Sequence, residues 1–220
     1  MAYQQYPSRT AKRNYFVMPN KIHSCNINPT AYAVYAYMRY NRKEDPNFEN
    51  VPALLGISKT AFQKALDELT DKFLLLEFDG QYHLRWLCED FGNCYPMPNE
   101  IFNLDLPVGA IAVYGFLLCC EDRDTYQCYP SYQTIGGAVG MSRSTVKKYV
   151  DCLVDKRLIY TEPTRVWGMG GKKRNGTLLY TIRPIYEAIQ HHANQQTNQL
   201  YEAFFHIGTS FGNRYPCIHP

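Results

Sequence analysis

The segment Ser142–Lys148 concentrates side chains that can contact a polyanion. It reads Ser-Arg-Ser-Thr-Val-Lys-Lys, with one apolar residue at Val146 and no acidic residue before Asp151. If the segment is helical, its hydroxyl and cationic groups share the exposed side, and Arg and Lys suit guanine edges or phosphate groups. The chemistry predicted here is recognition of double-stranded DNA. The residues expected to make these contacts are Ser142, Arg143, Ser144, Thr145, Lys147 and Lys148.

A second basic cluster lies between residues 162 and 176, where the sequence predicts a long connection between two strands. Its glycines permit close approach to a DNA backbone, and its cationic side chains can neutralise phosphates or enter the minor groove. The competing interpretation is a loop that is only solvated. A phosphate-binding P-loop is excluded, because Val166 stands where that motif requires its first glycine. The candidate contact residues are Arg165, Lys172, Lys173 and Arg174.

The chain contains two similar units in tandem. Gly56-Ile57-Ser58-Lys59-Thr60 recurs as Gly140-Met141-Ser142-Arg143-Ser144 after 84 positions, and Met18-Pro19-Asn20 recurs as Met97-Pro98-Asn99 after 79. A period this long indicates a duplicated domain and not a solenoid repeat. The first unit is less basic, so its alternative role is packing or dimerisation. Its candidate DNA contacts are Ser58, Lys59, Thr60, Gln63 and Lys64.

The elements that must position these residues follow from capping residues and periodicity. In the first unit, Asn28-Pro29 predicts the start of a helix over 29–40, and Ser58 caps a third helix over 59–71. Asp79-Gly80 predicts the turn of a hairpin. The second unit repeats this order. Its expected elements are helices opening at Pro107 and at Pro130-Ser131, a helix over 143–155 capped by Ser142, and strands over 158–161 and 177–182.

Three helices followed by a hairpin predict a winged helix in each unit. The expected fold class is mainly α with small β-hairpins (α+β), with two tandem winged helix-turn-helix domains plus a C-terminal helix. Because each unit has its own helices and hairpin, each is expected to fold alone. The expected organisation is a flexible basic arm (1–15), winged-helix domain 1 (16–88), winged-helix domain 2 (95–183), and a C-terminal helix and tail (184–220).

Charge and composition narrow the classes of partner. The formal net charge is +3, and residues 95–183 carry eleven basic against eight acidic groups, so the second unit is the better electrostatic match for DNA. The eight cysteines form no Cys-x-x-Cys pair, and His191, His192, His206, Cys217 and His219 fit no metal-ligand spacing. We expect reduced thiols in a cytoplasmic protein that is not an enzyme, without cofactor, metal, small-molecule ligand or membrane partner.

One known family shares the residues of the second unit. The matching motifs are Met97-Pro98-Asn99-Glu100-Ile101-Phe102, Ala112-Val113-Tyr114, Tyr129-Pro130-Ser131-Tyr132, Gly140 to Val146, and Leu158-Ile159. With them the chain resembles helix-turn-helix proteins of bacterial mobile elements, which are similar to the N-terminal winged helix of plasmid replication initiator A proteins and to phage replisome organisers. The resemblance covers 95–183 well and 16–88 weakly.

The resemblance implies sequence-specific binding of double-stranded DNA by a transcriptional regulator or replication-initiation factor of a mobile element, with Ser142 to Lys148 as the DNA-reading helix. The chain departs from the initiators by having two such units and no ATPase or polymerase-loading domain. An alternative is a protein-interaction scaffold of tandem winged helices, of the chromosome-segregation type. The near-neutral first unit fits that alternative, whereas the basic wing argues against it. A homodimer is left open.

Overall fold

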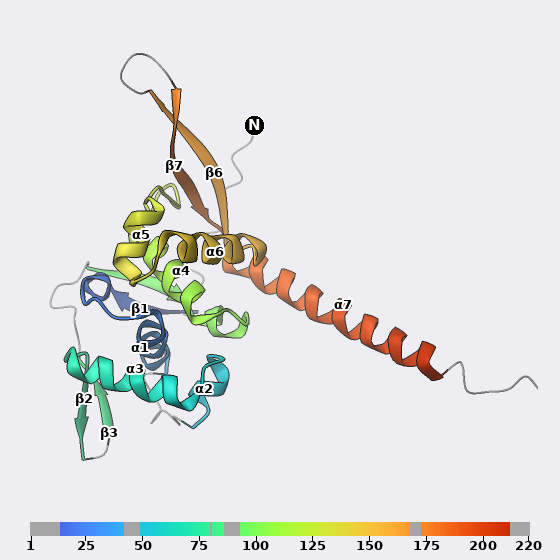
Figure 1. Ribbon diagram of the computed structural model, residues 1–220, viewed down its shortest axis with the longest axis horizontal. Helices are drawn as coiled ribbons and strands as arrows, with labels where there is room; N and C mark the ends of the chain where they lie inside the picture. The colour runs from blue at the N-terminus through green and yellow to red at the C-terminus, as the bar shows by residue number, and fades with distance from the viewer. Residues whose placement is uncertain (1–13, 42–48, 80, 86–92, 168–172, 212–220) are drawn as a thin grey trace, which may run out of the picture.

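The computed structural model describes residues 14–41, 49–79, 81–85, 93–167 and 173–211 of the 220-residue chain. Within them, helices alternate with short antiparallel sheets (Figure 1), which confirms the predicted α+β class. The elements of the first half are β1 (Tyr15–Pro19), the 3-10 helix η1 (Asn20–Ser24), α1 (Pro29–Tyr40), α2 (Val51–Leu54), α3 (Lys59–Asp71), β2 (Leu75–Phe78) and β3 (Gln81–Leu84).

The second half presents the same order with one added strand, β5, and its second helix and its hairpin strands are longer than their counterparts. Its members are β4 (Cys94–Pro98), the 3-10 helix η2 (Asn99–Asn103), α4 (Val108–Cys120), β5 (Gln127–Cys128), α5 (Tyr132–Val139), α6 (Arg143–Asp155), β6 (Ile159–Trp167) and β7 (Lys173–Ile182). A final helix, α7 (Ile185–Phe211), follows. It includes the predicted helical stretch and projects from the body of the molecule (Figure 1).

The helices begin where short polar side chains can satisfy their first backbone N–H groups. Asn28, Ser58 and Ser142 each accept a hydrogen bond from the N–H three residues ahead, at 2.9, 3.1 and 3.2 Å. These bonds confirm the three predicted caps, and each replaces a partner that the helix itself cannot supply. At the predicted start at Pro107, the proline is the cap residue and α4 begins at Val108.

The long connection predicted over residues 162–176 is wrong for most of its length. β6 continues to Trp167 and β7 begins at Lys173, so both arms of this segment are paired strands. The register shifts between Pro163 and Arg165, where the proline has no N–H to give to the ladder. The proline, glycines and charged residues of this segment favoured a loop in the prediction from sequence. The register shift allows the hairpin to extend past Pro163. β5 adds a third strand, in the order β5-β7-β6.

The two halves are joined by a sheet that the sequence did not predict. β1 pairs with β4 in antiparallel register, with Val17 opposite Pro96. Tyr15 therefore lies in this sheet and not in the predicted arm. The Asn14 side-chain amide next to it donates to a Glu100 carboxylate oxygen at 2.9 Å. Residues 1–13 of the predicted arm lie outside the described part of the chain.

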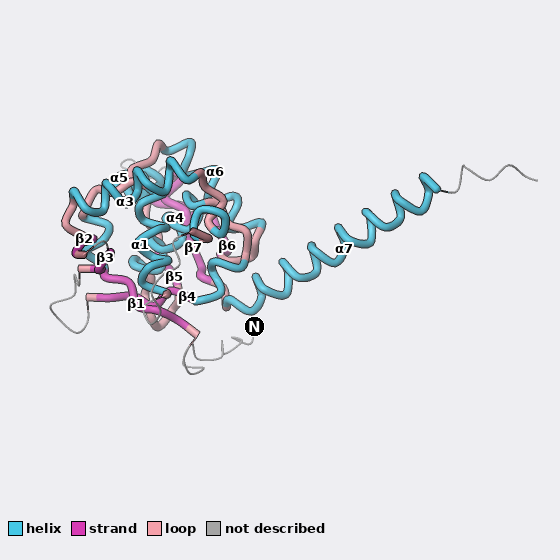
Figure 2. The backbone as a smooth tube through the Cα atoms, turned by 90° about the horizontal axis from the view of Figure 1, so that it is seen from below, coloured by secondary structure: helices cyan, strands magenta, loops and turns pink. Residues whose placement is uncertain are grey.

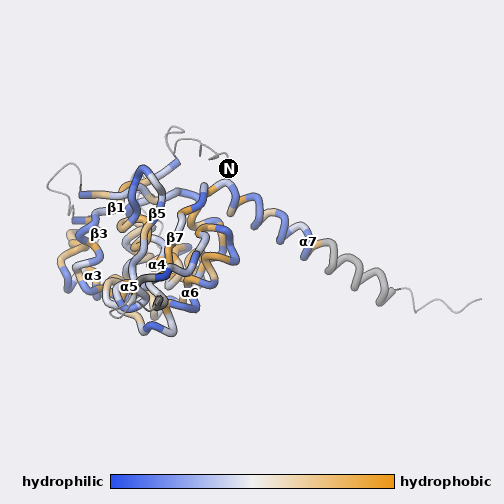
Figure 3. The backbone as a smooth tube through the Cα atoms, turned by 90° about the horizontal axis from the view of Figure 1, so that it is seen from above, coloured by the Kyte–Doolittle hydropathy of each residue, from blue (hydrophilic) through white to orange (hydrophobic). Residues whose placement is uncertain are grey.

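A single cluster of buried side chains continues from one half into the other. α1 packs against α4, and a Cβ added at Gly115 of α4 would lie 1.8 Å from the Tyr32 hydroxyl oxygen of α1. The missing side chain at Gly115 thus leaves the space that the Tyr32 side chain fills. Hydrophobic segments gather in this body, whereas the described part of α7 is mostly hydrophilic (Figure 3). The shared core runs counter to the expectation that each half folds alone.

Three further features bear on the predictions made from composition. Cys94 is disulfide-bonded, which the expectation of reduced thiols did not include. None of the helices in the described part of the chain combines the length and apolar character needed to cross a membrane. In the same ranges, no three His, Cys, Asp or Glu side chains come together in a way that could hold a metal ion.

Candidate nucleic-acid interface

The turn between α5 and α6 is built from two glycines. Gly140 ends α5 in the left-handed conformation (φ 67°, ψ 36°), which a residue without a Cβ adopts at little cost. The Met141 N–H then donates to the Gly136 carbonyl at 2.9 Å. A Cβ on Gly136 would lie 2.4 Å from the Met141 carbonyl oxygen, so only glycine lets the chain fold back this closely. The turn fixes the angle at which α6 leaves α5.

The inner face of α6 is held against the core. Val146, Val150 and Leu153 are fully or almost fully buried, as their spacing predicted. Tyr149 packs over Gly109 of α4, where a Cβ would come within 2.2 Å of the ring. α6 therefore lies rigidly on α4, and its opposite face is left to solvent.

The outer face of α6 carries three basic side chains that the sequence placed there. Arg143, Lys147 and Lys148 are all exposed. Lys147 donates to Asp151 at 2.7 Å, and this ion pair raises the lysine pKa. Because both side chains are more than half exposed, the pair contributes little stability, and exchange of Asp151 for a phosphate costs little. The Lys148 ammonium lies 5.9 Å from the centre of the Tyr149 ring.

The hydroxyl groups at the start of α6 are already engaged with one another. The Ser142 hydroxyl oxygen accepts the Thr145 N–H and also lies 2.8 Å from the Thr145 hydroxyl and 3.0 Å from that of Ser144. Ser142 thus acts first as a helix cap. Ser144 is exposed and Thr145 half-buried, so Ser144 is the more accessible of the two candidate contacts.

The matching positions of α3 are arranged in the same way. Lys59, Thr60 and Lys64 are exposed, and Ser58 is the cap. The Gln63 side-chain amide donates to Asp67 at 2.9 Å, in the place that Lys147 and Asp151 take in α6. The exposed face of α3 therefore has the same arrangement of side chains as that of α6, with one fewer cation.

The hairpin β6–β7 presents the remaining candidates. Arg165 is exposed in β6 and lies opposite Asn175 of β7. The backbones of Lys173 and Arg174 pair with Trp167 and Val166. The positions of these two side chains, and the whole of Lys172, lie outside what the structure describes.

The two candidate reading helices lie on one side of the molecule. In Figure 2, α3 and α6 are on the same face, with α1 and α4 beneath them and the β1–β4 sheet on the far side; in Figure 3, α3 and α6 again lie away from β1. In Figure 1, the hairpins β2–β3 and β6–β7 extend toward opposite ends. The structure therefore places the candidate contacts of α3 and α6 on one face.

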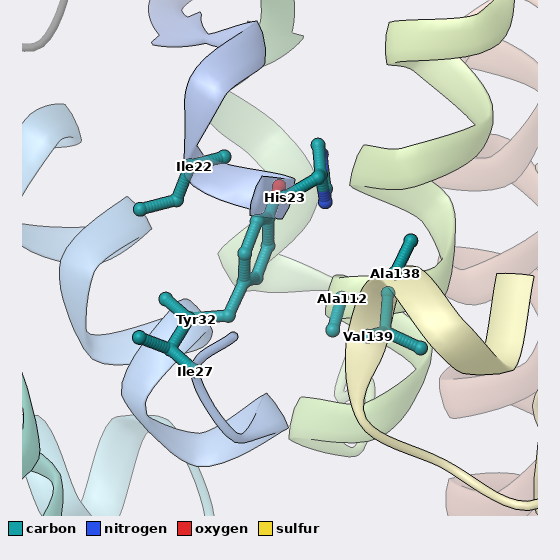
Figure 4. A pocket seen from close by; sticks show the side chains of 7 residues that line it. All are labelled: Ile22, His23, Ile27, Tyr32, Ala112, Ala138 and Val139. Carbon is teal, nitrogen blue, oxygen red and sulfur yellow. The ribbon is translucent and has the colours of Figure 1, made fainter. Parts of the chain in front are cut away.

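Beneath this face, a small hollow marks the junction of the halves. It has no room for a water molecule, and Figure 4 shows His23 and Tyr32 of the first half facing α4 and α5 across it. Burial lowers the pKa of His23 to about 4. The hollow is therefore part of the packing and not a ligand site. Its lining residues are Ile22, His23, Ile27, Tyr32, Ala112, Ala138 and Val139.

The sequence prediction omitted one residue that the fold places beside this interface. Gln133 is exposed in the first turn of α5, two residues after the Ser131 cap. In helix-turn-helix proteins the helix before the reading helix crosses the DNA backbone. The cap at Ser131 was the available signal, since it predicts which side chains stand at the exposed start of α5.

Residues 104–159, which run from the segment before α4 to the first residue of β6, match the family described as a helix-turn-helix domain. The matched segment is similar to helix-turn-helix domains and makes up about a quarter of the chain. It contains the Gly136–Gly140 turn and all of α6. No curated protein matches the chain.

Among solved structures, the chain is similar to a possible transcriptional regulator from Methanosarcina mazei Go1. The identity is 19%, with 53% of this chain and 93% of that chain covered and a TM-score of 0.34.

Proposed function

We propose that this protein binds double-stranded DNA in a sequence-specific way, as a non-enzymatic transcriptional regulator or replication-initiation factor of a mobile element. The observation that carries the proposal is the helix-turn-helix segment, whose α6 is packed by its apolar face and exposes Arg143, Lys147 and Lys148 on the other. A recognition helix needs this division, because its exposed side enters the major groove.

The proposed arrangement has two winged-helix units, residues 16–88 and 95–183, followed by residues 184–220. α6 supplies the main base contacts, and α3 supplies weaker ones. Arg165, Lys172, Lys173 and Arg174 of the second hairpin contact phosphates, which adds affinity without sequence preference. The cap residues Ser58 and Ser142 hold the helix starts in position against the DNA.

The test compares two single substitutions in the full-length chain. A duplex is first selected from a random library, and its affinity is then measured by fluorescence anisotropy at fixed salt. Arg143→Ala should weaken binding by about 1–3 kcal/mol if the guanidinium makes a bidentate base contact. Arg123→Ala removes an exposed cation whose guanidinium donates to the Cys94 carbonyl of the β1–β4 sheet, on the face opposite α3 and α6, and should bind as the wild type does. Equal affinities for wild type and Arg143→Ala would reject α6 as the reading helix.

A protein-interaction scaffold is the second candidate, and one observation favours it. Phe73, in the turn before β2, and Leu76 and Phe78 of β2 are 64, 47 and 68% exposed. Phe73 also adopts a positive φ of 54°, which is costly for a bulky residue. The second half has Arg157, Tyr160 and Glu162 at these positions. Exposed apolar side chains along β2 and the turn before it suit a protein partner better than a phosphate backbone.

A further inference from the structure

We propose that a single chain binds DNA as an internal pseudo-dimer and recognises an inverted repeat with two unequal halves. The inference rests on the proposed function, since it requires that the protein bind duplex DNA. Tandem duplication of a reading domain would by itself favour a direct repeat. The way the two halves are joined favours the inverted one.

The β1–β4 sheet places the halves about an approximate two-fold axis. Val17 lies opposite Pro96, its own counterpart in the repeat 79 positions later. On either side of this pair the partners exchange: Phe16 lies opposite Met97, and Tyr95 lies opposite Met18. Since Phe16 corresponds to Tyr95 and Met18 to Met97, the second pairing is the first one rotated by half a turn.

The core beneath the sheet follows the same symmetry. α1 packs against α4, which is its counterpart. Phe102 of the second half stacks on Phe16 of the first, with ring centres 5.9 Å apart. Their counterparts His23 and Tyr95 stack with the halves exchanged, at 5.7 Å. The two-fold relation therefore extends from the strands through the packed helices.

This axis determines how the reading helices meet DNA. α3 and α6 lie on the face opposite the sheet, and the two hairpins point to opposite ends (Figures 1 and 2). In dimeric helix-turn-helix proteins, the two-fold axis between the reading helices coincides with the dyad of the duplex, so the half-sites are inverted and about one helical turn apart. The same arrangement within one chain presents α3 and α6 to oppositely directed half-sites.

The two half-sites are expected to differ because the two helices carry different side chains. α6 exposes Arg143 and Lys147 where α3 exposes Lys59 and Gln63. Arginine forms bidentate contacts with guanine and glutamine with adenine. The half-site under α6 should therefore be the stronger and more sharply defined, with the weaker one beside it in opposite orientation.

The experiment is a selection by the full-length protein from a random duplex library of about three helical turns, followed by sequencing. The selected half-sites are then rebuilt in inverted and direct order on otherwise identical duplexes. We expect an inverted pair, with the inverted duplex bound about tenfold or more tightly than the direct one. Arg143→Ala should relax one half of the selected motif and Lys59→Ala the other, while light scattering shows one chain per duplex.

Three results would overturn this inference and leave DNA binding intact: enrichment of a direct repeat, enrichment of one half-site alone, or two chains on each duplex. Failure to enrich any sequence, with no measurable binding to duplex DNA, would instead reject the proposed function. The two failures are thereby distinguished within one selection.

Discussion

His23 and Phe102 occupy equivalent places in the two halves and make equivalent contacts with the opposite half. The His23 ring lies 5.7 Å from Tyr95 in a stack and 5.1 Å from Phe116 at an edge. The Phe102 ring stacks on Phe16 and meets Tyr37 at an edge, 5.4 Å away. One side of the pseudo-symmetric core is thus aromatic and apolar, and the other contains an imidazole.

The imidazole brings hydrogen bonds into this core. One ring nitrogen donates to the Gly115 carbonyl, and Nε2 lies 3.0 Å from the Tyr95 hydroxyl. The Tyr95 hydroxyl in turn lies 2.6 Å from that of Tyr32. A neutral ring that donates at one nitrogen can accept from the Tyr95 hydroxyl at the other. Burial lowers the pKa of His23 to about 4.

His23 should make stability depend on pH. Between about pH 6.5 and 4, the unfolded chain takes up a proton on this residue that the native chain does not. Stability should therefore fall as the pH falls through that window, by up to about 3 kcal/mol. His23→Phe copies Phe102 and should remove this dependence, as measured by urea unfolding at several pH values. His83→Asn, at an exposed histidine of β3, serves as the control. A persistent slope in His23→Phe would assign the dependence to other groups.

Gly115→Ala should destabilise the junction of the halves. Its Cβ would lie 1.8 Å from the Tyr32 hydroxyl oxygen and 2.7 Å from Cζ, and the buried tyrosine cannot move aside without breaking its bond to Tyr95. We expect a loss of about 1–3 kcal/mol in thermal or urea unfolding.

Gly137→Ala in α5 is the matched control for Gly115→Ala, because a Cβ there meets nothing within 4 Å. It should stabilise the protein by about 0.5–1 kcal/mol through helix propensity. Tyr32→Phe should recover part of the loss in Gly115→Ala by removing the nearest atom. Equal stabilities for the two glycine variants would contradict the close packing of α1 on α4.

Sequence reasoning succeeded where structure depends on near neighbours. The Ser142 cap was predictable because the N–H it accepts is only three residues away. The pairing of Val17 with Pro96 was not, since it joins two five-residue strands that lack an alternating pattern and lie 79 positions apart. The repeated Met-Pro-Asn motif marks both strands, but a repeat does not reveal that its copies pair with each other.

In the candidate site, too, features that depend on near neighbours in the sequence were predictable and others were not. The exposure of Arg143 and the burial of Val146 follow from helical periodicity, so the sequence was sufficient for the orientation of α6. The length of the second hairpin was missed, because Pro163 and the following charged residues indicate a loop unless the register shift is known. Which of the exposed cations contact DNA stays a prediction.

Replacing Lys172, Lys173 and Arg174 together by alanine should weaken binding to selected and random duplexes alike. These residues connect or begin the strands of the second hairpin, and phosphate contacts depend little on sequence. The slope of log K against log salt should flatten by up to about three units, one for each lost contact. Anisotropy titrations across a salt series give this slope. An unchanged slope would mean that the hairpin tip does not reach the DNA.

The isolated second half should associate with itself. In a fragment of residues 93–200, β4 has no β1 to pair with. Tyr95 and Met97, which are almost fully buried in the whole chain, become exposed to solvent. The two-fold relation offers a substitute, because a second fragment can supply its own β4 and α4 in place of β1 and α1. We therefore expect a homodimer and not a folded monomer. The whole chain, whose two halves are covalently linked, should remain monomeric at the same concentration. Light scattering and circular dichroism of both proteins test this. A stable, folded, monomeric fragment would show that each half is an independent domain and would restore the expectation drawn from the sequence.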